Sequence, residues 1–271
     1  MSNETKADDV RATVREHYGN VARGANTGCA PGCCSTTGTA AATLGYTADQ
    51  AAAAPEGADL GLGCGNPTAI ASLRDGETVL DLGAGGGFDC FIAARQVGPH
   101  GRVIGVDMTA DMVARARDNA HKVSAANVEF RLGEIEHLPV ADASVDVILS
   151  NCVINLSPDK LAVFREAHRV LRAGGRLAIS DVVATGPIPL ALQNQAAALA
   201  GCVAGAAPLD DVRAMLASAG FVDVAVTIAP RSAEIVGAWL PGIERFLASA
   251  TIEARKPGAG AGSCCGPECC A

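Results

Sequence analysis

The chain has no long apolar run and comparatively little positive charge. No stretch reaches the roughly eighteen apolar residues that span a bilayer, and the N-terminal MSNETKADDV lacks the basic and apolar regions of a secretion signal. Lysine and arginine number 21 against 29 acidic residues, whereas nucleic-acid binding depends on clustered positive charge. We therefore expect a cytoplasmic protein without a membrane or nucleic-acid partner, and nothing in the sequence demands more than a monomer.

Cysteine, in contrast, is abundant. Eleven cysteines are an odd number, and without a secretion signal they indicate metal, redox or nucleophilic chemistry before structural disulfides. Clusters near the two ends, Cys29–Cys34 and Cys264–Cys270, each contain two cysteines separated by three residues, a spacing within the range seen for zinc ligands. However, no histidine follows at the spacing of a zinc finger, and adjacent thiols fit one tetrahedral site poorly. Zinc is thus the minority interpretation, and vicinal thiols suit a soft trivalent metalloid.

Apolar strands and helical segments alternate from residue 78 onward, which predicts parallel βαβ units and a doubly wound, mostly parallel α/β sheet. Expected strands are Thr78–Asp81, Arg102–Asp107, Val128–Leu132, Asp146–Ser150, Arg176–Val183 and a late strand within Phe221–Pro230. Expected helices are Asp8–Arg23, Phe88–Val97, Ala110–Ala120, Pro158–Leu171, Leu190–Leu199 and Leu209–Ala219, with Gly174-Gly175 ending the helix that starts at Pro158.

Composition divides the chain into four parts. Gly, Ala, Thr and Cys dominate after the first helix, and the last residues are low in complexity. We expect an N-terminal helix and cysteine-bearing flap over residues 1–60, a cofactor-binding core over 61–184, a small substrate-facing C-terminal subdomain over 185–256 and a flexible cysteine-rich tail over 257–271.

A glycine-rich loop follows the first predicted strand. The segment DLGAGGG runs from Asp81 to Gly87 between a strand and a helix, where glycine lets the backbone turn sharply and approach a ligand. Phe88 stands where a dinucleotide fingerprint requires glycine or alanine, while the G-x-G-x-G spacing is similar to that of S-adenosylmethionine enzymes. S-adenosylmethionine is therefore favoured over NAD.

Further polar residues follow the next strands. Asp107 ends the second strand about twenty residues after the loop, where a carboxylate accepts the hydrogen bonds of a ribose diol, and it fits either cofactor. Glu134 and Ile135 follow the third strand and Asn151 the fourth. Because ligands bind beyond the carboxyl ends of parallel strands, these residues are expected to line one crevice. Glu134 can equally be a solvated loop acid.

Three cysteines lie near this predicted crevice. Cys64 stands in GLGCGNP, Cys152 directly follows Asn151, and Cys202 stands in GCVAG. Any one of them, taken alone, can equally be a small buried hydrophobe. Cys90, inside the helix after the glycine loop, is expected to pack in the core.

Taken together, LGLGCGNP, DLGAGGGFDCFIA, VIGVDM, SNCVINLSPDK, VLRAGGRLAISDV and GCVAGA resemble arsenite S-adenosylmethionine methyltransferases between about Leu60 and Ala206. The resemblance implies a seven-stranded sheet of class I methyltransferase type and As(III) coordination by Cys64, Cys152 and Cys202. It also implies that the fourth cysteine of the set is Cys34, with Cys29 and Cys33 as open alternatives. The positions that match the family's cofactor site are Gly83, Ala84, Gly85, Asp107, Met108, Ile135 and Asn151; Asp81 and Glu134 complete our predicted set.

The resemblance implies methyl transfer from S-adenosylmethionine to thiolate-bound arsenic, with arsenite or its thiol conjugates as substrate. Alkylation formally oxidises arsenic. Oxidation of two thiols, such as those of Cys34 and Cys64, to a disulfide would return it to the trivalent state. Glutathione or a thioredoxin-like partner would then reset the enzyme. Two alternatives stay open: a methyltransferase of a small organic acceptor, and a thiol-rich metalloid-binding protein on a degenerate methyltransferase fold. No role is carried over to Cys264–Cys270.

Overall fold

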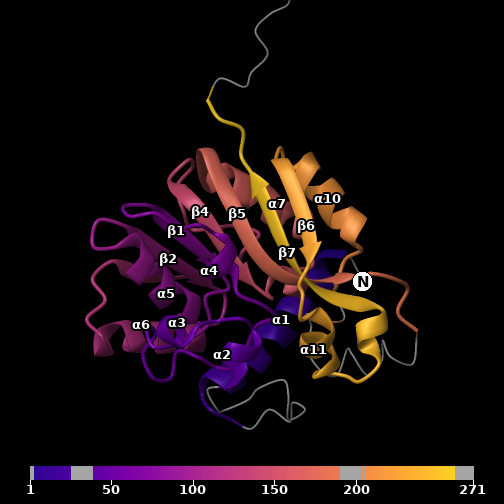
Figure 1. Cartoon of the computed structure of the whole chain (residues 1–271), viewed down its shortest axis with the longest axis horizontal. Helices are drawn as coiled ribbons and strands as arrows, with labels where there is room; N and C mark the ends of the chain where they lie inside the picture. The colour runs from indigo at the N-terminus through magenta and orange to yellow at the C-terminus, as the bar shows by residue number, and fades with distance from the viewer. Residues whose placement is uncertain (1–2, 26–38, 190–202, 204, 260–271) are drawn as a thin grey trace, which may run out of the picture.

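A seven-stranded sheet in the order β3-β2-β1-β4-β5-β7-β6 forms the centre of the molecule (Figure 1). The computed structural model describes residues 3–25, 39–189, 203 and 205–259. The strands are β1 (Thr78–Leu82), β2 (Arg102–Asp107), β3 (Val128–Leu132), β4 (Val145–Asn151), β5 (Leu171–Ala184), β6 (Val222–Ile228) and β7 (Leu247–Arg255).

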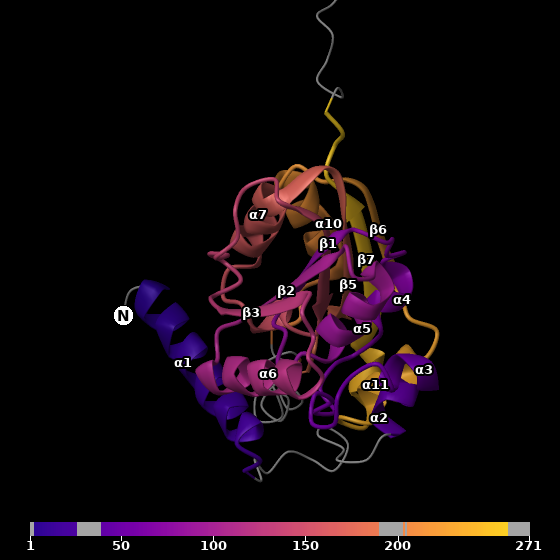
Figure 2. The same ribbon diagram turned by 90° about the vertical axis from the view of Figure 1, so that its left-hand side faces the viewer.

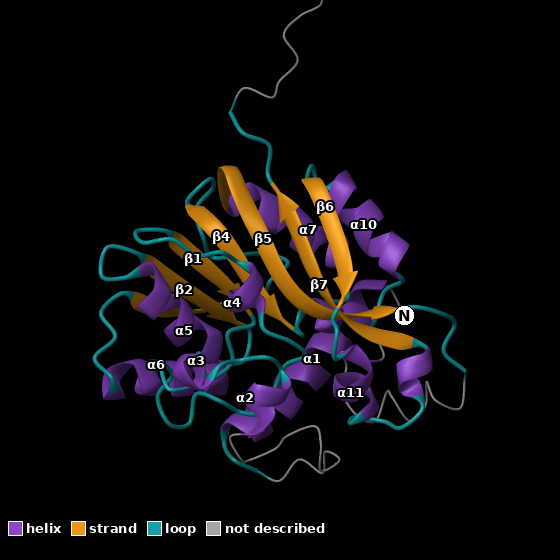
Figure 3. Ribbon diagram, viewed as in Figure 1, coloured by secondary structure: helices purple, strands orange, loops and turns teal. Residues whose placement is uncertain are grey.

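The sheet is mixed, which corrects the prediction of a mostly parallel one. Strands β1 to β5 pair in parallel, but β7 lies between β5 and β6 and runs antiparallel to both (Figure 3). A parallel neighbour needs a crossover over the face of the sheet. The chain between β6 and β7 instead forms short helices that pack against β7, so the strand returns in the opposite direction.

Helices cover both faces of the sheet (Figure 2). Alternation along the strands sends Val79 and Val103 toward α5 (Phe88–Val97) and α6 (Ala110–Lys122). It sends Leu80 and Ile104 toward α7 (Lys160–Val170) and α10 (Leu209–Ser218), so that two large apolar cores form. The helices are α1 (Asn3–Ala22), α2 (Thr39–Thr43), α3 (Ala48–Ala51), α4 (Pro67–Ile70), α5 (Phe88–Val97), α6 (Ala110–Lys122), α7 (Lys160–Val170), α10 (Leu209–Ser218) and α11 (Ser232–Gly237), with the 3-10 turns η1 (Ile154–Leu156) and η2 (Ile243–Arg245). None of the helices in the described ranges is long and apolar enough to span a bilayer.

The predicted strands β1 to β5 are confirmed, but the prediction that Gly174-Gly175 ends the preceding helix is wrong. Helix α7 ends at Val170, and Gly174-Gly175 lies inside β5 and not at a helix end. The reason is that Leu171 already pairs with Val145 of β4, so sheet hydrogen bonding takes over directly after the helix. The predicted helix Leu190–Leu199 lies outside the described residues, as do the cysteines of both terminal clusters.

Arg176 of β5 ties this strand to the segment before β1. Its guanidinium donates to both carboxylate oxygens of Glu77 at 2.7 and 2.8 Å, and to the carbonyl oxygens of Ala71 and Ser72. The two charged side chains are only 15% and 14% exposed. Burial tends to raise the pKa of Glu77, but hydrogen bonds from Arg176 and from the Arg74 N–H outweigh it and hold the pKa below its ordinary value.

Replacing Glu77 with glutamine should lower the free energy of unfolding at pH 7 by about 2 kcal/mol, because Arg176 loses its charged partner in a mostly buried site. A carboxylate with a lowered folded-state pKa stabilises the protein above its unfolded pKa, and this contribution is lost as pH falls through the folded pKa. The difference between the parent and Glu77→Gln should therefore shrink below about pH 4.5. Urea unfolding between pH 7 and pH 3 measures it. The matched Glu234→Gln, in an exposed pair with Arg231, should have little effect, and a pH-independent loss at Glu77 would contradict the account.

Candidate active site

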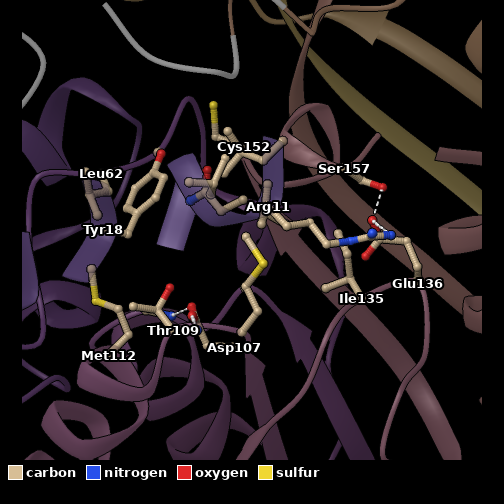
Figure 4. Close-up of a pocket in the computed structure, with 18 of the residues that line it drawn as sticks. Arg11, Tyr18, Leu62, Asp107, Thr109, Met112, Ile135, Glu136, Cys152 and Ser157 are labelled. Carbon is tan, nitrogen blue, oxygen red and sulfur yellow. Dashed lines mark hydrogen bonds and ion pairs between the residues drawn. The ribbon is translucent and has the colours of Figure 1, made fainter. Parts of the chain in front are cut away.

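A cavity of about 1130 Å³, including its solvent-open mouth, lies at the carboxyl ends of the parallel strands (Figure 4). Loops after β1, β2, β3 and β4 contribute to its wall, and one face of α1 covers it. Its wall includes Arg11, Val14, Tyr18, Leu62, Gly63, Gly83, Gly85, Asp107, Met108, Ile135, Glu136, Asn151, Cys152, Val203 and Trp239. This is the position at which open α/β sheets bind ligands.

The glycine loop and Asp107 form one end of the cavity. Gly83 has a φ of 68°, and a Cβ there would collide with the side chain of Val153. The Asp107 carboxylate accepts hydrogen bonds from the backbone N–H groups of Gly85 at 2.9 Å and Thr109 at 2.8 Å. Burial raises the pKa of Asp107 and these hydrogen bonds oppose the rise. The carboxylate is therefore held in one orientation at the cavity wall.

The predicted cofactor residues divide into two groups. Gly83, Gly85, Asp107, Met108, Ile135 and Asn151 line the cavity. Asp81, Ala84 and Glu134 are not part of that wall, and their contact with a cofactor stays a prediction.

Each of the residues away from the wall has another environment. Asp81 is buried in β1, where burial and the neighbouring Asp89 raise its pKa well above the ordinary value. The Cys90 thiol donates to Asp81 at 3.2 Å and is fully buried, which confirms that this cysteine packs in the core. Ala84 is buried against the same core, and Glu134 forms ion pairs with α1.

Helix α1 supplies wall residues that the sequence analysis missed. Arg11, Val14 and Tyr18 all line the cavity, and their spacing of three and four residues is the signal that places them on one helix face. Arg11 pairs with Glu134 and Glu136 at 3.4 Å each. These ion pairs fix the helix over the ends of the strands.

Cys64 and Cys152 lie together at the other end of the site. Their Sγ atoms and a carboxylate oxygen of Asp181 lie within 4.8 Å of one another. Cys152 lines the cavity, whereas Cys64 is fully buried. Cys152 has a φ of 58°, and its N–H donates to the Ser180 carbonyl oxygen at 2.8 Å. The turn after β4 thus holds this thiol against the segment that carries Cys64.

Asn151 fastens the Cys64 segment. Its Oδ1 accepts from the Cys64 N–H at 3.0 Å, and its Nδ2 donates to the Gly65 carbonyl oxygen at 2.9 Å. On its other side Nδ2 lies 3.0 Å from the Tyr46 hydroxyl and 3.2 Å from Asp89. The Tyr46 hydroxyl donates to Asp89 at 2.6 Å, and burial raises the pKa of Asp89 to about 6. One side chain therefore joins the Cys64 segment to α5.

Asp181 is the charged group that sequence reasoning did not find. It is 2% exposed, and it accepts hydrogen bonds from the Ile154 N–H at 3.0 Å, the Asn155 side-chain amide at 2.8 Å and the Val182 N–H at 2.7 Å. Burial raises its pKa to about 6 despite these donors. Its proximity to two thiols depends on the pairing of β4 with β5, which no local pattern reveals.

Two of the predicted arsenic-handling cysteines, Cys34 and Cys202, lie outside the described residues. Their roles stay predictions. Val203, the neighbour of Cys202 in the chain, is described and lines the cavity together with Trp239.

Comparison with known proteins agrees with this geometry. Residues 73–220 match a family model described as a methyltransferase domain. The chain is 52% identical over 263 residues to the arsenite methyltransferase of Halobacterium salinarum, covering 92% of this chain and 67% of that protein. It is 31% identical over 230 residues to the arsenite methyltransferase of Mus musculus, covering 82% of this chain and 60% of that protein.

A solved structure adds to this agreement. The crystal structure of an arsenic (III) S-adenosylmethionine methyltransferase from Chlamydomonas reinhardtii is similar to this chain, with a TM-score of 0.61 and 32% sequence identity. The match covers 81% of this chain and 73% of that one. The resemblance seen in the sequence is confirmed, and the chain belongs to the arsenite methyltransferase family.

Proposed function

We propose that this chain transfers methyl groups from S-adenosylmethionine to trivalent arsenic held by cysteine thiolates, and that it serves arsenite detoxification. The observation that carries the proposal is the shared cavity: Asp107 and the glycine loop line one end, and Cys152 lines the other with Cys64 beside it. The printed names of the relatives support the same activity.

The residues at the donor end fit S-adenosylmethionine. The Asp107 carboxylate, fixed by two backbone N–H groups, has lone pairs left to accept hydrogen bonds from a ribose diol. The close approach of Gly83 to Val153 leaves the loop backbone as the wall there, and Met108 and Ile135 offer apolar surface. When bound, S-adenosylmethionine supplies an electrophilic methyl group on its sulfonium sulfur.

At the acceptor end the thiols replace the oxygen ligands of arsenite. Each thiol proton leaves with one hydroxyl group as water, and an As–S bond replaces an As–O bond. We assign Cys64 and Cys152 to two of these bonds and Cys202 to the third. Trivalent arsenic keeps a lone pair, which is the nucleophile, so no general base is required. Holding both reactants in one cavity can contribute about 7–11 kcal/mol to lowering the barrier.

The reductive half of the cycle is also part of the proposal. Methylation raises the formal oxidation state of arsenic by two, and oxidation of two thiols to a disulfide supplies the two electrons that reverse it. We assign this pair to Cys34 and Cys64: the Cys34 thiol loses its proton to solvent and attacks the Cys64 sulfur, the As–S bond to Cys64 breaks, and its electron pair returns arsenic to the trivalent state. Glutathione or a thioredoxin-like partner then reduces the disulfide, and the chain acts as a monomer in this proposal.

The direct test is to incubate the purified chain with S-adenosylmethionine, arsenite and a reducing thiol, and to separate the arsenic species by chromatography. Methylated arsenic should form in proportion to enzyme. A folded sample that binds S-adenosylmethionine yet yields no methylated arsenic would contradict the proposal.

Cysteine variants test whether the described thiols at the acceptor end hold the arsenic. Cys64→Ala and Cys152→Ala should each reduce arsenite methylation by about 100-fold or more, because a lost thiolate misplaces the arsenic, while S-adenosylmethionine binding persists. Cys90→Ala is the matched control and should stay active, since Cys90 lies in the core. Fluorescence of Trp239, the chain's single tryptophan and part of the cavity wall, reports arsenite binding. Near-parent arsenite methylation in Cys152→Ala would contradict the role of this thiol as an arsenic ligand.

Asp107→Asn should weaken S-adenosylmethionine binding about tenfold or more. A hydrogen bond to a charged group contributes roughly 1.5–3 kcal/mol, and about 1.4 kcal/mol corresponds to a factor of ten in affinity. Isothermal titration calorimetry measures the change. Asp111→Asn, an exposed aspartate on α6 paired with Arg23, should bind like the parent, and equal affinities for all three chains would remove Asp107 from the donor site.

A further inference from the structure

We propose that Cys64, Cys152 and Asp181 together form a binding site for a divalent thiophilic cation, Zn²⁺ or Cd²⁺. This cation would compete with arsenic for the same two sulfur atoms. The competition rests on the proposed function, whereas the cation binding itself does not.

The donor geometry fits such a cation. Three ligand atoms from different segments, namely the loop before α4, the end of β4 and the interior of β5, lie within 4.8 Å of one another. In a tetrahedral zinc site with Zn–S near 2.3 Å and Zn–O near 2.0 Å, donor atoms lie about 3.5–3.8 Å apart. Small side-chain rotations close that difference. Because Cys152 lines the cavity, the fourth position is left for water.

Asp181 has the surroundings of a ligating carboxylate. Both of its oxygens are oriented by hydrogen bonds from Ile154, Asn155 and Val182, as is usual for carboxylates that bind metals. These donors occupy only part of the four lone-pair positions of the group. A free lone pair can therefore face the two sulfur atoms without breaking this support.

Arsenic and a divalent cation, the two species that could bind at this site, differ in whether they bond to Asp181. Trivalent arsenic is soft and bonds to sulfur, so a carboxylate oxygen adds nothing to an arsenic trithiolate. A divalent cation accepts mixed sulfur and oxygen ligands, and two thiolates with one carboxylate offset its charge. On binding, the two thiols release their protons to solvent. Asp181 is thus the group that distinguishes the cation from arsenic.

Cadmium-113 NMR tests the ligand set with Cd²⁺ alone as probe. The sample is the full chain with serine at each cysteine outside the described residues, which retains Cys64, Cys90 and Cys152; the serine positions are Cys29, Cys33, Cys34, Cys202, Cys264, Cys265, Cys269 and Cys270. We expect one bound Cd²⁺ with a chemical shift between those of all-oxygen and all-thiolate sites. Cys90→Ala should leave this signal in place and Cys152→Ser should abolish it. An all-oxygen shift, an all-thiolate shift or no bound cadmium overturns the proposal.

Inhibition of the unmodified chain gives a second readout that does not depend on the multiple serine variant. With each protein compared to its own uninhibited rate, the Cd²⁺ concentration that halves methylation should rise about tenfold or more in Asp181→Asn. EDTA should restore the rate, because it removes Cd²⁺ but has no thiol for arsenite. Equal sensitivity of parent and Asp181→Asn contradicts the inference. A mixed-ligand cadmium signal in a chain that never methylates arsenite would remove the proposed function and leave the cation site standing.

Discussion

The hydrogen bonds of the Asn151 side-chain amide are the interactions on which the geometry of both ends of the cavity depends. It stands at the end of β4, accepts a hydrogen bond from the Cys64 N–H and donates to the Gly65 carbonyl oxygen. Its contacts with Tyr46 and Asp89 reach α5, the helix that begins at the glycine loop. Hydrogen bonds in such a poorly solvated place are strong, and an unpaired member would be costly. One small, partly buried network therefore joins the Cys64 segment to the helix that follows the glycine loop.

The mixed sheet completes the acceptor end. Because β7 returns antiparallel beside β5, Ser249 reaches the Cys64 carbonyl oxygen and donates to it at 2.6 Å. The segment that precedes β7 carries Trp239 to the cavity wall. Cys64 is thus fixed from two directions, by Asn151 at its N–H and by Ser249 at its carbonyl group. These two hydrogen bonds hold the backbone of Cys64 on both sides.

The sequence predicts what local patterns encode. The strands β1 to β5, the glycine loop, Asp107 and the place of Cys152 after Asn151 all follow from apolar runs and from residues at strand ends. Strand β7 was missed because alanine and serine, such as Ala248, Ala250 and Ser249, supply much of its buried surface and give a weak apolar signal. The other features of the site depend on contacts between residues far apart in the sequence. Such contacts bring Asp181 to the two thiols and Arg11 to Glu136, and they bury Asp81 in the core.

In the proposed function, arsenic and the methyl donor occupy the two ends of one cavity. Anomalous diffraction at the arsenic edge tests it most directly, on crystals grown with arsenite and S-adenosylhomocysteine. We predict an arsenic peak bonded to the sulfur atoms of Cys64 and Cys152, with the nucleoside ribose on Asp107. Arsenic bound only at the terminal cysteine clusters, or a nucleoside outside this cavity, would contradict the account.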